Sequence, residues 1–366
     1  MTPSPLRVLV VDDSRIFRGI IETALANQPG VRVVGSVWSG EKALELAREQ
    51  LPDFVTLDIQ MPGLGGIATL KALRELAAAR RHPLGVLLVS AHTRQGAAVT
   101  VEGLQEGAFD FLCKPDSPDA RANEINLRRQ LLEKIELWRN SRHPGFRRGT
   151  PPAPPARPAI PPGQSFQPPQ RGVCRYRALL IGSSTGGPEA LSELLPRFAP
   201  QAPLPILLVQ HLPADFASYF AQSLARRAGT SVVEAADGQP AVAGRIYLAP
   251  GGSHLVLRSG DGHLVCGLSD SPPENGCRPA VDVLFRSAAA ACGDRALAIV
   301  LTGMGQDGAR GALSLRRAGS RVLVQDQESS VVWGMPGTTV EMGAADEVHS
   351  LAAMGDAVRR HLGMGD

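Results

Sequence analysis

The first third of the chain contains five side chains suited to phosphoryl transfer, each where an apolar, strand-like segment ends. Carboxylates that crowd together repel one another unless a cation neutralises them, and an all-oxygen set of ligands suits Mg²⁺. With the cation bound, one aspartate can attack a phosphoryl group while a hydroxyl and an ammonium group meet its new oxygens. A single aspartate at a strand end is usually a helix cap or a solvated turn, but five residues in this order predict a phosphorylation site. They are Asp12, Asp13, Asp58, Ser90 and Lys114.

These five residues, with the Lys–Pro pair that ends the set, make residues 6–130 resemble the receiver domain of two-component response regulators. The resemblance implies that a sensor histidine kinase supplies a phosphoryl group to Asp58. Phe111, three residues before Lys114, matches the aromatic switch position of that family, although a phenylalanine of the core is almost as good an interpretation. The implied Mg²⁺ ligands are Asp12, Asp13 and Asp58, and the implied switch residues are Ser90, Lys114 and Phe111.

A second group of reactive residues begins in the segment LLIGSSTGGPEAL. Its Gly182-x-Ser184-x-Gly186 matches the nucleophile-elbow pattern, in which glycines let the backbone turn sharply and expose a hydroxyl. Pro188 is well placed to open a helix. A glycine-rich turn from a strand into a helix also binds phosphate. The pattern alone therefore leaves a nucleophilic serine and a phosphate site about equally favoured.

A nucleophilic serine needs a base, and the base needs a carboxylate to orient it. His211 directly follows the apolar segment PILLVQ, which predicts that it emerges at the same sheet edge as Ser184, and His254 is the rival base. Asp307 lies in the glycine-rich segment LTGMGQDGA, where backbone N–H groups can also point at an oxyanion, and Asp282 is the rival carboxylate. Spacing ranks neither pair.

Residues 176–362 resemble the protein-glutamate methylesterase of bacterial chemotaxis, the CheB family. The resemblance implies that Ser184 is the nucleophile, His211 the base and Asp307 the carboxylate that orients it. It also implies that the Met304 amide binds the oxyanion and that Thr185 supports the site. The motifs that carry it, in order, are Ser184–Thr185–Gly186–Gly187, Gln210–His211, APGGSH up to His254, RPAVD up to Asp282, and GMGQDG around Asp307.

The implied activity is phosphorylation-controlled hydrolysis of glutamate γ-methyl esters on the cytoplasmic helices of chemoreceptors. Ser184 would attack the ester carbonyl, methanol would leave, and water would hydrolyse the acyl-enzyme. The same chemistry on a glutamine side chain releases ammonia, so deamidation is an expected second activity. Mg²⁺ is expected in the receiver and no cofactor in the catalytic domain. We hypothesise that the unphosphorylated receiver covers Ser184. The alternative is an output domain that binds a ligand or partner without catalysis.

The elements that must position these residues follow from hydrophobic patterning. Strand-like runs, largely continuous in hydrophobicity, alternate with helical patterns, as in parallel sheets buried on both faces. We expect a flavodoxin-like (βα)₅ receiver followed by a doubly wound parallel α/β domain with an inserted β-hairpin. The receiver strands are expected within 7–13, 31–37, 54–60, 85–91 and 109–115, the later ones within 177–184, 205–212, 244–250, 296–303 and 321–326, and the hairpin within 254–269.

The two halves are separated by a segment rich in proline and arginine. Ten of the 30 prolines lie between Pro144 and Pro169, which predicts an extended, semi-rigid linker that is long for the family. We place the receiver at residues 1–138, the linker at 139–175 and the catalytic domain at 176–366. The linker contains seven arginines and no acidic residue, and without them the net charge of +3 becomes −4. This charge distribution argues against nucleic acid as a partner.

The chain carries no signal for secretion or for a membrane helix. Its hydrophobic fraction of 43% is that of a globular protein, and its apolar runs are of strand length. No basic, then apolar, leader opens the sequence, so we expect the cytoplasm and no membrane insertion. The five cysteines form no C-x-x-C pair, which favours reduced thiols over disulfides or a zinc site.

Overall fold

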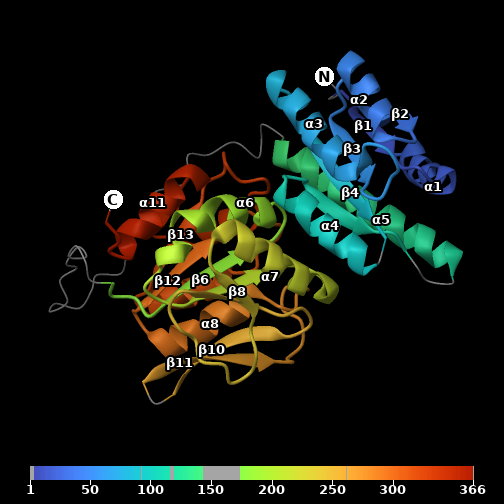
Figure 1. The fold of residues 1–366 in the computed structure, drawn as a ribbon. Helices are drawn as coiled ribbons and strands as arrows, with labels where there is room; N and C mark the ends of the chain where they lie inside the picture. The colour runs from blue at the N-terminus through green and yellow to red at the C-terminus, as the bar shows by residue number, and fades with distance from the viewer. Residues whose placement is uncertain (1–3, 92, 116–118, 143–173, 261, 366) are drawn as a thin grey trace. The chain divides into compact units, whose positions relative to one another are not determined.

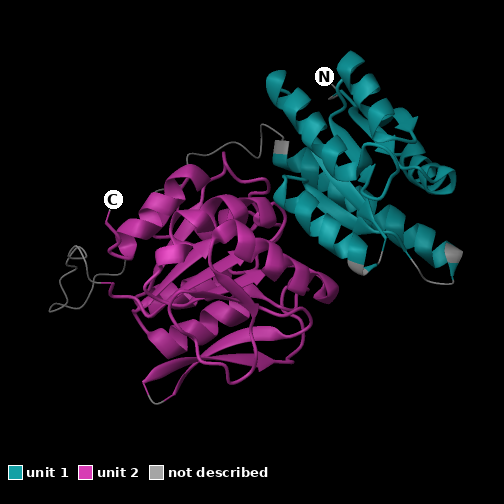
Figure 2. Cartoon of the chain, in the orientation of Figure 1, with its two compact units in different colours: residues 1–146 teal, residues 147–366 magenta. Residues whose placement is uncertain are grey.

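The structure is a computed structural model that describes residues 4–91, 93–115, 119–142, 174–260 and 262–365. The chain divides into two compact units, within residues 1–146 and 147–366 (Figure 2). Most of the expected linker, residues 143–173, lies outside the described residues, and its first four residues, 139–142, belong to a helix. The division at 138 and 176 stays a prediction.

The first unit is the expected receiver-like fold, a five-stranded parallel sheet with the order β2-β1-β3-β4-β5 (Figure 1). Each expected strand is confirmed. Ser39 caps α2, where its hydroxyl accepts a hydrogen bond of 3.4 Å from Lys42 N. The elements are β1 (Leu6–Val11), α1 (Arg15–Ala26), β2 (Val31–Val37), α2 (Gly40–Glu49), β3 (Phe54–Asp58), α3 (Gly65–Ala79), β4 (Gly85–Ser90), α4 (Arg94–Gln105), β5 (Asp110–Cys113) and α5 (Ala120–Arg142).

The second unit is built on a seven-stranded parallel sheet with the order β14-β13-β12-β6-β7-β9-β8. The expected strands and the hairpin β10–β11 are present. The short strands β8 and β14 were not expected, because runs of four and three residues carry too little pattern. The elements are β6 (Ala178–Ser183), α6 (Gly187–Leu194), β7 (Ile206–Gln210), α7 (Ala214–Ala228), β8 (Ser231–Glu234), β9 (Arg245–Leu248), β10 (His254–Gly260), β11 (His263–Ser269), α8 (Val281–Cys292), β12 (Ala296–Val300), α9 (Ala309–Arg317), β13 (Arg321–Gln325), α10 (Met335–Glu341), β14 (Glu347–His349) and α11 (Leu351–His361).

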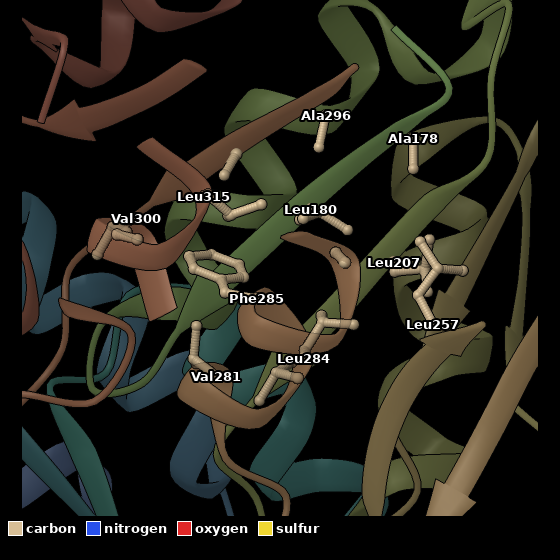
Figure 3. Close-up of a cluster of buried hydrophobic side chains, with 14 of the residues drawn as sticks. Ala178, Leu180, Leu207, Leu257, Val281, Leu284, Phe285, Ala296, Val300 and Leu315 are labelled. Atoms are coloured by element: carbon tan, nitrogen blue, oxygen red, sulfur yellow. The ribbon is translucent and has the colours of Figure 1, made fainter. Parts of the chain in front are cut away.

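Helix α8 is buried between this sheet and the hairpin. Figure 1 shows α8 and the hairpin on one face of the sheet, with α6 and α7 on the other. Leu284 and Phe285 of α8 meet Leu180 and Leu207 from the sheet, and Leu257 from the hairpin closes the layer (Figure 3). Burying one such side chain stabilises the fold by about 1.5–3 kcal/mol. The hairpin therefore holds α8 in place, and the first turn of α8 belongs to the site.

Among the described residues, no helix combines the length and the apolar character that crossing a bilayer requires.

Candidate active site

Three adjacent strands bring the expected triad to one edge of the second sheet. Ser184 follows β6, His211 follows β7 and Asp307 lies in the loop after β12, and these strands are neighbours in the order β12-β6-β7. Parallel strands end at the same edge of a sheet. After β6 the chain continues to β7 on one side of β6, and it later returns to β12 on the other side. The carboxyl end of β6 is therefore at the switch point of the sheet, the place where open α/β sheets commonly bind ligands.

Register places the first two members next to each other. Ser183 pairs with Gln210 across β6 and β7, and His211 N donates a hydrogen bond of 3.1 Å to Ser183 O. The residues that follow this pair, Ser184 and His211, therefore leave neighbouring strands at the same level, where strands lie about 4.8 Å apart.

The turn after β6 has the form that the glycine pattern predicts. Gly186 has φ of +78°, and Pro188 lies in the first turn of α6. A side chain at Gly182 would place its Cβ 2.3 Å from Val281 Cγ1. A Cβ at Gly187 would lie 2.1 Å from Gln210 Oε1. Both positions need glycine because neighbouring elements pack directly against the backbone.

Gln210 ties this turn to β7. Its Oε1 accepts a hydrogen bond of 2.7 Å from Ser183 Oγ, and its Nε2 donates one of 2.9 Å to Ser184 O. The Gln210 side chain is buried. The amide therefore fixes the backbone that carries Ser184, a role that the Gln–His motif did not reveal.

Asp307, rather than its rival Asp282, contacts His211. His211 Nε2 lies 2.8 Å from Asp307 Oδ2, and the carboxylate is 2% exposed. Burial raises the pKa of Asp307, but the hydrogen bond and charge of His211, with backbone donors, outweigh burial and lower it. Because Asp307 is an ionised acceptor, Nε2 of His211 donates to it, and Nδ1 is the nitrogen that lacks a proton in the neutral imidazole. Cys277 Sγ lies 3.7 Å from that Nδ1.

The neighbours of His211, the candidate base, shift its pKa. Burial lowers the pKa of His211, but the hydrogen bond with Asp307 and the contact with Cys277 outweigh it and raise the pKa to about 9. An imidazole with this pKa is protonated at neutral pH in the resting protein, and only its neutral form can accept a proton from a serine.

Asp307 also caps α8. It accepts hydrogen bonds from Val281 N (2.7 Å) and Asp282 N (3.0 Å), the first two backbone donors of that helix. Asp282, which belongs to α8, in turn accepts a hydrogen bond of 2.6 Å from Gly311 N in the first turn of α9. The carboxylates of Asp282 and Asp307 thus cap each other's helix, which satisfies N–H groups that a helix leaves unpaired.

The two rival residues have structural roles. His254 is fully buried, its Nδ1 accepts a hydrogen bond of 3.0 Å from Ala280 N, and its Nε2 lies 3.2 Å from Pro272 O. Both ring nitrogens are therefore occupied by backbone. Asp282 is likewise fully buried and serves α9 rather than an imidazole. Tertiary contacts thus separate residues that spacing could not rank.

The hydroxyl of Ser184 is the candidate nucleophile. Within the described residues the Ser184 hydroxyl forms no hydrogen bond, including with His211. Its backbone is fixed, because Ser184 N donates to Thr302 O over 3.1 Å. Catalytic hydrogen bonds often tighten only when substrate binds. The contact between Ser184 and His211 stays a prediction.

The oxyanion loop runs beside the serine. A Cβ at Gly303 would lie 2.8 Å from Ser184 Cβ, so the loop that leads into Met304 lies against the nucleophile. The Met304 N–H donates to no other described residue, and its side chain is 40% exposed. Thr185 is buried, and its carbonyl accepts a hydrogen bond of 3.0 Å from Thr302 Oγ1. Thr302, which the sequence did not single out, joins the two loops.

The first unit gathers its five expected residues at the carboxyl ends of its strands. Oxygens of Asp12, Asp13 and Asp58 lie within 4.8 Å of one another. Lys114 Nζ lies 2.7 Å from Asp12 Oδ2 and 2.8 Å from Asp58 Oδ2. Ser90 is buried at the end of β4, and its carbonyl accepts a hydrogen bond of 2.7 Å from Lys114 N.

This acidic cluster fits a divalent cation. Asp12 Oδ2 is buried and has no hydrogen bond of good geometry, although the Lys114 ammonium is near it. Burial raises the pKa of Asp58, Lys114 opposes this, and the charge of Asp12 adds to it. The donors are all oxygen, the ligands that Mg²⁺ prefers. Phe111 lies half-buried on β5, an exposure that suits either a switch or the rim of a core.

One further residue was missed at the sequence level. Asn275, in the loop before α8, donates from Nδ2 to both Asp282 and Asp307 over 3.0 Å. The signal that could have found it is the Asn275–Gly276 pair, which predicts a tight turn close to a candidate carboxylate.

Comparisons with known proteins match both units. Residues 8–126 match the response regulator receiver domain, and residues 179–358 match the CheB methylesterase. A protein-glutamate methylesterase/protein-glutamine glutaminase of Xanthomonas campestris is 40% identical and covers 94% of each chain. One from a Nocardioides strain is 41% identical over 98% of this chain and 95% of its own. The crystal structure of the Thermotoga maritima CheB methylesterase catalytic domain is 37% identical, with 50% of this chain and 97% of that chain covered and a TM-score of 0.49.

Proposed function

Because the chain belongs to the CheB family of protein-glutamate methylesterases/protein-glutamine glutaminases, we propose that Ser184, His211 and Asp307 are its catalytic triad. The protein is a response-regulator methylesterase and glutaminase of chemotaxis adaptation. This identity sets aside the alternative of an output domain without catalysis. The observation that carries the triad is the 2.8 Å contact of His211 with a buried Asp307, at the level of the sheet where Ser184 leaves the neighbouring strand.

In the proposed reaction, Nδ1 of His211 takes the proton of the Ser184 hydroxyl as its oxygen attacks the γ-carbonyl of a methylated glutamate. Asp307 keeps the proton on Nε2 and stabilises the imidazolium that forms. The imidazolium then gives its proton to the departing oxygen, and methanol leaves. Water attacks the acyl-enzyme with the same base and returns Ser184. On a glutamine substrate the leaving group is ammonia.

The Met304 N–H is proposed to hold the negative oxygen of each tetrahedral intermediate. An N–H group that has no internal partner can donate to the oxyanion without first breaking another bond, and one such donor typically contributes about 3 kcal/mol to the transition state. Thr185 supports this site through its bond with Thr302, which keeps the Ser184 turn and the Met304 loop together.

In the receiver, we assign Asp58 as the phosphate acceptor and Asp12, Asp13 and Asp58 as the residues that hold Mg²⁺. The cation supplies positive charge that neutralises the phosphoryl oxygens and the carboxylates. Lys114, already 2.8 Å from Asp58, stays with the modified side chain, and Ser90 and Phe111 respond to it. The donor is proposed to be a histidine kinase and the substrate the methylated cytoplasmic helices of a chemoreceptor.

The test is release of methanol from a methylated receptor by the full chain, with and without a small phosphodonor. Ser184→Ala should lower the rate roughly 10⁴-fold or more while the circular dichroism spectrum is unchanged, because a triad fails when its nucleophile is removed. Ser192→Ala removes a hydroxyl that only bonds Pro188 O in α6, and it should keep full activity. Turnover by Ser184→Ala above one tenth of the wild-type rate would exclude the triad.

A further inference from the structure

A tight turn, residues 274–277, lies beside the two carboxylates that cap α8 and α9. Its ends exchange two backbone hydrogen bonds, 3.0 Å from Glu274 N to Cys277 O and 2.9 Å from Cys277 N to Glu274 O. Asn275 has φ of +53° and Gly276 has φ of +78°. Two successive positive φ angles define a type I′ turn, for which Asn–Gly is a preferred pair. Glycine would serve the turn equally well at position 275, so the turn alone does not explain the asparagine.

The Asn275 side chain reaches from this exposed turn to both carboxylates. Its Nδ2 donates to Asp282 Oδ2 and to Asp307 Oδ1, each over 3.0 Å. Asp282 and Asp307 are 0% and 2% exposed. An amide nitrogen has two N–H donors and no charge, so it can serve two acids at once. Burial raises the pKa of Asp282, and the charge of Asp307 adds to the rise, while Gly311 and Asn275 oppose it.

We propose that Asn275 is a positioning residue of the esterase, whose amide bridges the two buried carboxylates and holds Asp307 in the orientation that fixes His211. The proposal rests on the triad proposed above. Asn275 does not touch the reacting atoms. It acts through Asp307, whose other oxygen receives His211 Nε2 and the first N–H of α8.

The first variant is Asn275→Gly, which keeps the positive φ of the turn and removes the amide. We expect kcat to fall at least tenfold and KM to change less than twofold, because the base is misoriented while the substrate surface is unchanged. Gln239→Ala is the matched control. It removes an amide that accepts a hydrogen bond from Ala236 N in a turn elsewhere in the unit, and it should leave kcat within twofold of wild type.

The second variant is Asn275→Asp, which has the same shape but only acceptors when ionised. Once protonated, the introduced carboxyl group regains one donor. The ratio of the variant's kcat to that of wild type should therefore rise as the pH falls. The other titratable groups near the turn are Glu274, paired with Arg286 at 2.6 Å, and Cys277 and His211. These groups are present in both proteins.

If Asn275 only shapes the turn, kcat of Asn275→Gly should stay within twofold of wild type, and the kcat ratio of Asn275→Asp to wild type should not change with pH. Either result overturns the proposal. If Asn275→Gly does not fold, the pH dependence of the Asn275→Asp ratio alone decides whether Asn275 positions Asp307. Ser184→Ala is measured alongside. If it is inactive while Asn275→Gly is normal, only the role of Asn275 is wrong. If it is active, the triad fails, and this proposal fails with it.

Discussion

At the scale of single residues, the site depends on one imidazole between an acid and a thiol. Asp307 accepts from Nε2 of His211, and Cys277 Sγ lies 3.7 Å from Nδ1, the nitrogen proposed to receive the serine proton. Both neighbours raise the pKa of His211 against the effect of burial, to about 9. The same contacts that orient the base therefore keep it protonated over much of the neutral range.

We predict that kcat/KM of the unphosphorylated protein rises with pH up to about 9, because only neutral His211 can act as the base. Cys277→Ala should move this limb to lower pH, since one of the groups that raises the pKa is removed. Cys174→Ala is the control and should leave the limb unchanged, because the Cys174 thiol lies away from His211 and donates to Tyr176 O. A pH profile that Cys277→Ala does not displace would contradict the assignment of the base.

Stability should follow the opposite trend. The pKa of His211 is raised in the fold from the ordinary value of 6.5, so its ion pair with Asp307 stabilises the fold fully below about pH 6.5. This contribution is lost as the pH rises through about 9. Activity and the free energy of unfolding therefore change in opposite directions across the same range.

At the scale of elements, hydrogen bonds connect the loops at the strand ends to the first turns of helices. Asp307 caps α8 from the loop after β12, and Asp282 caps α9 from the first turn of α8. Helix α8 is itself covered by the hairpin, where Leu257 N donates to Ser287 Oγ over 2.9 Å. The carboxylate that orients the base is thus fixed by the packing of a whole layer.

Because of this double role, Asp307→Ala should lose activity and stability together. We expect kcat to fall by about 10³–10⁴-fold because the imidazole loses its orientation. Loss of the cap should lower the free energy of unfolding by about 1–2 kcal/mol, measured by urea denaturation. Ser184→Ala, which removes no cap, should lose only activity. Equal stability of the two variants would show that Asp307 contributes nothing to α8.

At the scale of the whole molecule, a phosphorylation switch and an esterase are joined in one chain as two compact units, each with its own sheet and core. Each has its reactive residues at the carboxyl ends of its parallel strands, Asp58 in one and Ser184 in the other. We propose that the receiver's contribution is control of the esterase.

The hypothesis that the unphosphorylated receiver restrains the esterase predicts three rates of methanol release. The full chain should be slow, its phosphorylated form fast, and residues 176–366 alone at least as fast as the phosphorylated form. Asp58→Asn should stay slow with the phosphodonor present, and removal of Mg²⁺ by a chelator should have the same effect. Restraint is excluded if residues 176–366 are no faster than the unphosphorylated full chain.

Hydrophobic patterning along the chain predicts the order of nearly all the strands, the hairpin and the group of residues from which each site is built. Apolar runs identify parallel strands, and in such sheets reactive residues gather where strands end, so Ser184 and His211 were expected at one edge. Asp12, Asp58 and Lys114 were expected together for the same reason. Only the short strands β8 and β14 carried too little pattern to be predicted.

Tertiary structure alone decided which of two similar residues meets which partner. His254 and His211 both follow or begin strand-like runs, but only the latter reaches a carboxylate, while backbone occupies both nitrogens of the former. Asp307 rather than Asp282 meets the imidazole, and Asn275 joins the two acids from a loop. Spacing along a chain specifies where each backbone emerges, whereas a hydrogen bond between residues 96 positions apart, such as that of His211 with Asp307, depends on how loops and helix ends pack.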